Sequence, residues 1–245
     1  MERAAIRIGT SGWEYDHWRG DFYPSDLPKD RWLEHYARTF GTVELNASFY
    51  RLPQRSTFVR WGARAPNGFT FSVKASRYLT HLKRLSEPDE PLQRFWSRAT
   101  GLGDRLGPVL YQLPPRWKPN PERLAQFLER VPQERAQALE FRDARWYGAW
   151  LDTLLGSAGV ALCLHDMAGS SPEPRPVGPF VYLRLHGSGA RYGGRYSDAA
   201  LAAWAARLSD WADAGLPAWV YFYNDIGGHA PRDAVRLRER IDGAR

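Results

Sequence analysis

The feature that most restricts the fold of this chain is the repeated alternation of short apolar segments with helix-like stretches. Eight segments have the length and the β-branched or aromatic character of buried strands. They are Ile6–Gly9, Val43–Leu45, Phe69–Val73, Val109–Leu113, Ala138–Phe141, Val160–Leu164, Phe180–Leu185 and Trp219–Tyr223. Eight strand–helix units in 245 residues match the arithmetic of a closed parallel barrel. The pattern therefore predicts an α/β fold, a TIM-type (β/α)8 parallel barrel that occupies residues 1–245 as a single domain.

Capping residues mark the helices between these segments. Asn120 stands where an N-cap is expected, Pro121 suits the first helical position, and Pro132 ends the apolar periodicity that follows. Ser197 precedes a second periodic stretch, which closes before Gly215. Both signals indicate helices in the places that the barrel pattern requires.

An open, doubly wound sheet is the rival architecture. It is disfavoured because the one Gly-rich stretch, His186–Gly194, follows the seventh apolar segment and has Tyr192 where G-x-G-x-x-G needs its third glycine. The stretch Gly169–Pro179 is too rich in proline for a helix. We therefore expect a barrel whose sixth crossover is an irregular loop.

The composition limits the cellular compartments and the binding partners that we expect for this chain. Cys163 is the only cysteine, which excludes an internal disulfide and a C-x-x-C motif. Met1–Trp13 lacks the apolar core of a secretion signal, and no stretch approaches the roughly 18 apolar residues of a membrane span. We therefore expect a cytoplasmic protein with no membrane partner. The net charge of +7 favours attraction to polyanions.

Polar residues follow each of the eight apolar segments. In a barrel of this kind the loops after the strands form one face, where functional groups gather. Three segment ends read E-x-N, E-x-R and R-x-H, and the two members of each pair point the same way because side chains alternate along a strand. If that way is inward, five charged side chains meet at the barrel mouth: Glu44, Lys74, Glu140, Arg142 and Arg184.

Charges in a low-dielectric interior are costly, so a chain that keeps five of them there must pair them or use them. One interpretation is a salt-bridge plug, in which Glu44 pairs with Lys74 and Glu140 with Arg142. A salt-bridge plug would need no histidines or amides, so we also consider that the polar residues at the strand ends form a functional site. The catalytic candidates are Glu44, Lys74, Glu140 and His186. The ligand-binding candidates are Trp13, Asn46, Tyr50, His81, Gln112, Arg142, Arg184, Tyr196, Asn224 and Asp225, and no residue is assigned to a metal.

The segment ends belong to longer stretches that carry a family resemblance. These are "IGTSGWEYDHWRGDFYP", "VELNASFYRLP", "FSVKASRYLTH", "YQLPP", "EFRDARW", "YLRLHG" and "YFYNDIGGHA", in this order. With them the chain closely resembles the YecE-like family, catalogued as domain of unknown function 72, along nearly its whole length. The resemblance implies a TIM-type barrel and brings no established activity. Two places depart from the family pattern: Met167-Ala168, where members commonly have Asp-x-Pro, and Arg145, which replaces a small residue.

The first functional hypothesis is a phosphate-containing ligand, with nucleic acid as one form of it. Lys74, Arg142 and Arg184 would hold anionic oxygens. Arg191 and Arg195 accompany the glycines after the seventh segment, a region where such barrels often bind phosphate. Aromatic side chains could stack on bases, namely Trp13, Trp18, Phe49, Tyr50 and Tyr196. The competing interpretation, which we prefer for Phe49, is that these rings pack loops against the barrel.

A metal-dependent form of this hypothesis follows by analogy with barrel enzymes that use divalent ions to cut phosphodiester bonds. The chain has 6 histidines and no tight ligand spacing such as H-x-H or H-E-x-x-H. The cofactor is therefore left unassigned, and a divalent metal is the less favoured variant. Its candidate ligands are Glu44, His81, Glu140, His165, Asp166, His186 and Asp225.

Two other classes of function stay open. In a carbohydrate-active enzyme, Glu44 and Glu140 would act as acid and base or nucleophile, but a nearby cation lowers the pKa of a glutamate and disfavours a general acid. A non-enzymatic module would use the same mouth to bind a small anion. An enzyme at this site would be a hydrolase of phosphodiester or glycosidic bonds. Ser11 lacks a G-x-S-x-G context and Cys163 lies in an apolar run, so neither is expected to be a nucleophile. No protein partner is indicated.

Overall fold

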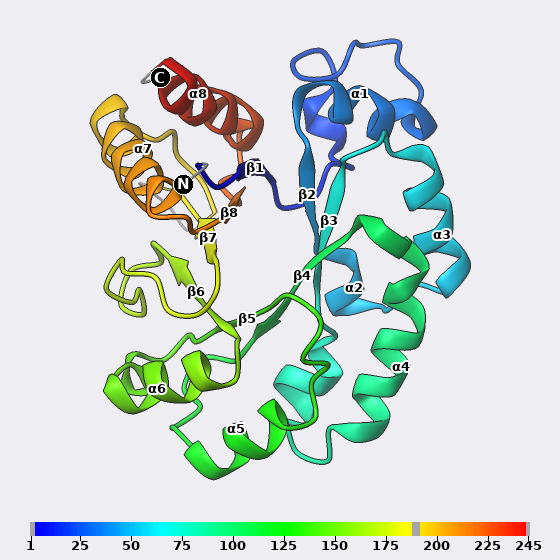
Figure 1. The fold of residues 1–245 in the computed structure, drawn as a ribbon. Coiled ribbons are helices and arrows are strands. Elements are labelled where there is room, and N and C mark those ends of the chain that lie inside the picture. Colours follow the sequence, from blue (N-terminus) through cyan, green and yellow to red (C-terminus); the bar gives the residue numbers. More distant parts are fainter. Residues whose placement is uncertain (1–2, 188–191, 244–245) are drawn as a thin grey trace.

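The structure, a computed structural model that describes residues 3–187 and 192–243, contains a nearly closed barrel of eight parallel strands (Figure 1). The strands are β1 (Ile6–Thr10), β2 (Thr42–Leu45), β3 (Thr70–Lys74), β4 (Leu106–Gln112), β5 (Gln137–Glu140), β6 (Ala161–His165), β7 (Val181–Leu185) and β8 (Ala218–Phe222). Each overlaps one of the apolar segments expected from the sequence. The predicted TIM-type fold is therefore confirmed.

Helices connect the strands and surround the barrel (Figure 1). The α-helices are α1 (Trp32–Thr39), α2 (Ala47–Tyr50), α3 (Arg55–Arg64), α4 (Asp89–Ala99), α5 (Pro121–Leu128), α6 (Ala149–Ser157), α7 (Asp198–Asp213) and α8 (His229–Gly243). Both predicted N-caps are present: the Asn120 side chain accepts a hydrogen bond from the Arg123 backbone N–H, and the Ser197 hydroxyl accepts one from that of Ala200. Residues 166–180, all of which are described, contain no helix, so the sixth crossover is the loop that its prolines indicate.

The barrel interior is apolar below its mouth. Seven buried side chains form a cluster separate from the larger core between strands and helices: Leu110, Ala138, Ala161, Cys163, Phe180, Tyr182 and Tyr221. Alternation places Ala138 beneath Glu140 and Tyr182 beneath Arg184 on the same inward face. Burial raises the pKa of the Cys163 thiol, so the thiol is uncharged and packs as an apolar group in the barrel interior. Because this layer is packed, any ligand has to bind above it.

The barrel closes between β1 and β2 by an unusual route. Seven of the eight strand junctions are hydrogen-bonded ladders, whereas β1 and β2 meet only through an isolated bridge between Ser11 and Glu44. The Tyr36 hydroxyl on α1 completes the junction, since it accepts from the Thr10 N–H at 2.9 Å and donates to the Thr42 carbonyl at 3.1 Å. Gly9 is required here, because a Cβ at this position would lie 2.2 Å from that carbonyl oxygen.

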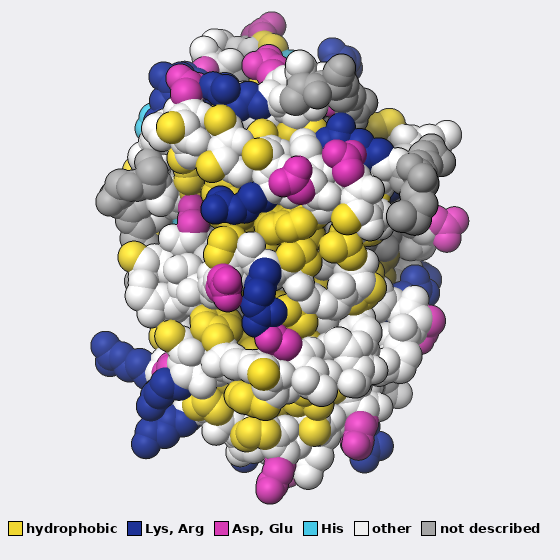
Figure 2. Space-filling model, turned by 60° about the vertical axis from the view of Figure 1, so that its left-hand side comes forward, with side chains coloured by type: hydrophobic (Ala, Val, Ile, Leu, Met, Phe, Trp, Pro, Cys, Tyr) yellow, Lys and Arg dark blue, Asp and Glu magenta, His cyan; other side chains and the backbone are white. Residues whose placement is uncertain are grey.

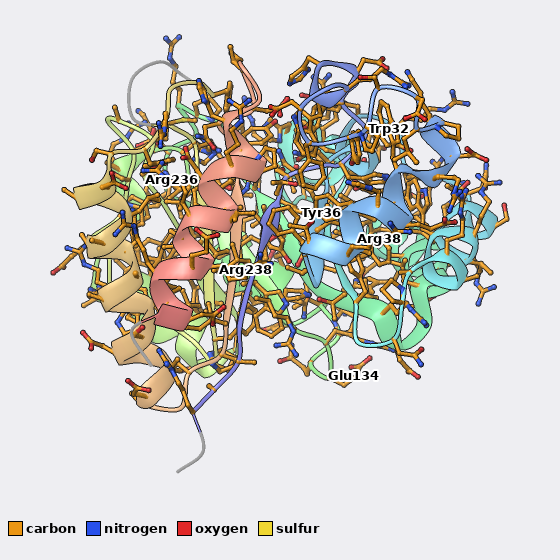
Figure 3. The ribbon with its side chains drawn as sticks, turned by 90° about the horizontal axis from the view of Figure 1, so that it is seen from above. Trp32, Tyr36, Arg38, Glu134, Arg236 and Arg238 are labelled. Carbon is orange, nitrogen blue, oxygen red and sulfur yellow. The ribbon has the colours of Figure 1, made fainter. Side chains whose placement is uncertain are left out.

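Two helices flank this junction. Figure 3 shows α8 and α1 on either side of β1, with Tyr36 on α1 facing the strand. Arg238 on α8 donates to the carbonyl of Thr39 at the end of α1, which ties the two helices together. The outer layer thus supplies the bonds that the strands themselves lack at this place.

We expect Tyr36→Phe to lower the free energy of unfolding by about 1–3 kcal/mol, because it leaves the buried Thr10 N–H without its acceptor. Urea denaturation measures the change. Tyr78→Phe is the matched control: this ring is 43% exposed, so the loss should stay within about 0.5 kcal/mol. Equal midpoints for the two variants would show that the Tyr36 hydroxyl does not hold the junction.

Candidate functional site

A buried arginine joins two carboxylates at the centre of the barrel mouth. Arg184 projects inward from β7, Glu44 from β2 and Glu140 from the end of β5. Arg184 Nη2 donates to Glu44 Oε1 at 2.9 Å, and Nη1 donates to Glu140 Oε2 at 2.7 Å. All three side chains are completely buried. The pairing across three strands offsets the desolvation that each charge would suffer alone.

Two hydroxyl groups also hold Glu44. Ser11 Oγ donates to its Oε1, and the Tyr182 hydroxyl donates to its Oε2 at 2.7 Å. The Asn46 amide donates in turn to Ser11 Oγ, which places both members of the E-x-N pair on the same side. Burial acts to raise the pKa of Glu44, but Arg184, the Ser11 hydroxyl and Lys74 outweigh it and leave the pKa below its usual value. Glu44 is therefore an anion at neutral pH.

Glu140 continues the network toward the loop after β6. Arg142 Nε pairs with Glu140 Oε1, and Arg142 Nη2 lies 2.9 Å from His186 Nε2. A guanidinium only donates, so His186 Nε2 must be the acceptor and the ring proton sits on Nδ1, 3.4 Å from Asp166 Oδ1. Burial and the nearby arginines lower the pKa of His186 to about 4, so this histidine is neutral. Burial opposes ionisation of Glu140, but Arg142 and Arg184 bring its pKa well below the usual value.

Lys74 at the end of β3 is the exception in this cluster. Its side chain is 5% exposed, and its Nζ lies 4.1 Å from the centre of the Phe49 ring. Among the residues that the structure describes, Nζ makes no hydrogen bond and no ion pair, because Arg184 and Arg142 occupy both glutamates. Burial, with the neighbouring Arg184 charge, lowers the pKa of Lys74 to about 7. The lysine is thus half-neutral near physiological pH.

Two adjoining cavities lie over these groups. The smaller, of about 270 Å³, is lined by Phe49, Tyr50, Lys74, Arg77, His81, Gln112, Pro115, Tyr192 and Tyr223. The larger, of about 890 Å³, shares Gln112, Pro115 and Tyr192 with it and extends over Arg116, Arg142, Asp166, His186 and Tyr196. The lining comes from loops and strand ends on one face of the barrel. Together the two cavities form the mouth of the barrel.

Several ligand-binding candidates lie away from the mouth. Trp13 is buried edge-on against Trp61 and Phe71. Asn224 donates to Asp233 Oδ2 at 2.8 Å, and Asp225 accepts from the Trp18 indole at 2.6 Å. Arg195 lines a different cavity beside α8, and Arg191 lies outside the described residues.

The metal candidates do not form a common set of ligands. His165 uses both ring nitrogens within the protein, since Nδ1 accepts from the Met167 N–H and Nε2 contacts the Phe141 carbonyl. Arg184 lies between Glu44 and Glu140 and pairs with both carboxylates. In residues 3–187 and 192–243, no group of three or more His, Cys, Asp or Glu side chains is arranged to hold a metal ion.

Sequence reasoning did not select several residues that line or support the mouth. Tyr182 lies two positions before Arg184 on β7, so strand alternation alone would have identified it as an inward-facing partner of Glu44. Arg77 and Arg116 are rim residues in loops after β3 and β4. Tyr223 follows β8 and packs under the Arg184 guanidinium, 5.0 Å from ring centre to Cζ. The conformation of the loops brings these three residues to the mouth, and no periodicity in the sequence predicts that placement.

No described helix has the length and apolar character needed to cross a membrane.

Known proteins resemble this chain over most of its length. A family described as "Protein of unknown function DUF72" matches residues 7–245. The UPF0759 protein YunF of Bacillus subtilis (strain 168) is 26% identical over 97% of this chain and 95% of its own length. The UPF0759 protein YecE of Escherichia coli (strain K12) is 29% identical over 58% of this chain and 50% of its own length. The crystal structure of TM1631, a DUF72 family protein from Thermotoga maritima, is 26% identical, with a TM-score of 0.88 over 97% of this chain and 99% of that one.

Proposed function

The chain belongs to the DUF72 family, whose members are described as proteins of unknown function, and from that premise we propose that its barrel mouth binds a small ligand carrying a phosphate group. The observation that carries this proposal is an excess of unpaired cations. Arg77 and Arg116 line the mouth, and among the described residues neither has an ion-pair partner. Arg142 and Arg184, in contrast, are neutralised by Glu140 and Glu44.

The division of roles follows from exposure. Arg77 and Arg116 are exposed on the rim, where their guanidinium groups can form paired hydrogen bonds to phosphate oxygens. Lys74 lies deeper, beside Phe49 and Gln112, where it meets the rest of the ligand. Arg184 is fully buried, so it fixes the two glutamates from beneath.

Cavity size favours a small molecule over a polynucleotide. Cavities of about 270 and 890 Å³ are of the size that holds one small ligand. Figure 2 shows Lys and Arg side chains interspersed with Asp and Glu over most of the face it presents, with a group of basic side chains at its lower left.

The glycosidic alternative receives less support. A glycosidase of the usual kind needs one carboxylic acid that stays protonated, which requires a raised pKa. Both glutamates have lowered pKa values and share Arg184 as a hydrogen-bond donor. A pure anion-binding module uses the same mouth and differs only in lacking turnover.

We expect glycerol 3-phosphate to bind the wild-type protein and Arg77→Met or Arg116→Met to weaken that binding roughly 10- to 100-fold, the value of a charge-assisted hydrogen bond. Isothermal titration calorimetry at two salt concentrations measures it. Arg60→Met, at an exposed position of helix α3, is the matched control and should change the Kd by less than about threefold.

Inorganic phosphate and single-stranded oligonucleotides complete the experiment. Oligonucleotides that bind more tightly than the monoester, with a steep salt dependence, would replace the small ligand by a polynucleotide. No binding of any phosphate compound, or equal binding by the two rim variants and Arg60→Met, would refute the proposal.

A further inference from the structure

Lys74 is chemically distinct in a chain that otherwise uses arginine. The sequence contains 34 Lys and Arg, of which only four are lysines: Lys29, Lys74, Lys83 and Lys118. Lys29 pairs with Asp16, Lys83 pairs with Glu87, and Lys118 is exposed. The buried position at the end of β3 therefore carries a residue that can lose its proton, where arginine would stay charged.

The surroundings of Lys74 supply what a nucleophilic amine requires. Its Nζ faces the smaller cavity, with Phe49 against one side and no carboxylate within ion-pair distance among the described residues. Desolvation and the Arg184 charge bring its pKa to about 7. At neutral pH an exposed lysine has roughly a thousandfold less of the neutral amine. Burial beside a second cation is a recognised way to activate a lysine.

A histidine lies in the same cavity. His81 Nδ1 is 3.0 Å from Thr80 Oγ1, and that hydroxyl is also 3.2 Å from the Ser76 carbonyl. His81 Nε2 makes no hydrogen bond among the described residues. Burial, with Lys74 and Arg77 nearby, lowers the pKa of His81 to about 4, which keeps the ring neutral.

We propose that Lys74 forms an imine with the carbonyl carbon of a small phosphorylated aldehyde or ketone, a substrate class that rests on the proposed phosphate-binding function. The Nζ–carbon bond forms as the carbonyl π bond breaks, which gives a carbinolamine. The carbinolamine oxygen then leaves as water with the two hydrogens that the neutral amine brought, and the imine nitrogen takes one proton from solvent. No oxidant or reductant is required.

Borohydride trapping tests this directly. The wild-type protein is incubated at pH 7 with glyceraldehyde 3-phosphate or dihydroxyacetone phosphate, reduced with sodium borohydride, and digested for peptide mass spectrometry. We expect the Lys74 peptide to gain the mass of the carbonyl compound less one oxygen atom. Its occupancy should exceed that of Lys29, Lys83 and Lys118 by roughly tenfold or more, because Lys29 and Lys83 are ion-paired and Lys118 is exposed, whereas Lys74 is buried at the cavity without an ion-pair partner among the described residues.

Lys74→Arg is the matched variant, since it keeps the positive charge and cannot form an imine. We expect it to yield no adduct at position 74. Wild-type protein that binds glycerol 3-phosphate but gives no Lys74 adduct, or gives equal adducts on Lys74 and Lys118, would overturn the imine and leave the phosphate site standing. Failure of glycerol 3-phosphate to bind would instead remove the function on which the inference rests.

Discussion

Arg184→Met should lower the free energy of unfolding by about 3–5 kcal/mol, the cost of stranding buried charges when their partner is removed. Two carboxylates depend on this guanidinium, at 2.9 Å from Glu44 and 2.7 Å from Glu140. Urea denaturation at pH 7 measures the loss. Arg60→Met removes an exposed arginine and should change stability by less than about 0.5 kcal/mol.

The pH dependence of this penalty provides a second, independent check. In the wild type the pKa values of Glu44 and Glu140 are lowered, so their stabilisation is present above the unfolded value of about 4.3 and is lost as the pH falls through the folded values. Without Arg184, Glu44 loses the largest of the influences that lower its pKa, so its folded-state pKa rises and the penalty shrinks between pH 7 and about 5. A penalty that is the same at both pH values, or no larger than that of Arg60→Met, would contradict the bridging role.

Lys74→Met should stabilise the protein at and below neutral pH. The folded pKa of Lys74 is about 7, whereas an unfolded lysine titrates near 10.4. Between these values the unfolded chain binds more protons, so stability contributed by this group rises with pH and is lowest below pH 7. Integrated over this pH range, the stability lost through Lys74 is about 3–5 kcal/mol. Lys74→Met removes this loss because methionine carries no charge.

The difference in unfolding free energy between Lys74→Met and the wild type isolates this lysine, because other titrating groups cancel. We expect the variant to be more stable at pH 6, with the advantage decreasing steadily toward pH 9. Lys118→Met, at an exposed position, should show no such trend. A constant difference across the range would mean that Lys74 stays protonated in the folded state.

The strands, their order and their inward polar ends were predictable, because a two-residue side-chain period and a strand–helix repeat are local properties of the sequence. The pairing of charges was predictable only in part, since Glu140 does pair with Arg142 as expected. The sequence suggested Glu44 with Lys74, yet Glu44 binds Arg184, whose longer, forked side chain spans from β7 to two other strands. Pairing across a barrel depends on register and side-chain reach, neither of which a single sequence displays.

The end of β8 illustrates the same limit. Asn224 and Asp225 follow a strand as the other polar residues do, but β8 ends at Phe222. The chain then turns, so that the two side chains meet Asp233 on α8 and Trp18 in the first loop. Strand alternation stops applying where the strand stops.

Ser11 and Glu44 stand on opposite sides of the junction between β1 and β2, the one place where the barrel has no ladder. Thermal loosening of the cylinder at that joint would separate the serine from the carboxylate that anchors the charged network. The structure of the mouth therefore depends on the least hydrogen-bonded junction of the barrel. A ligand that binds across the mouth would also stabilise the closure of the whole barrel.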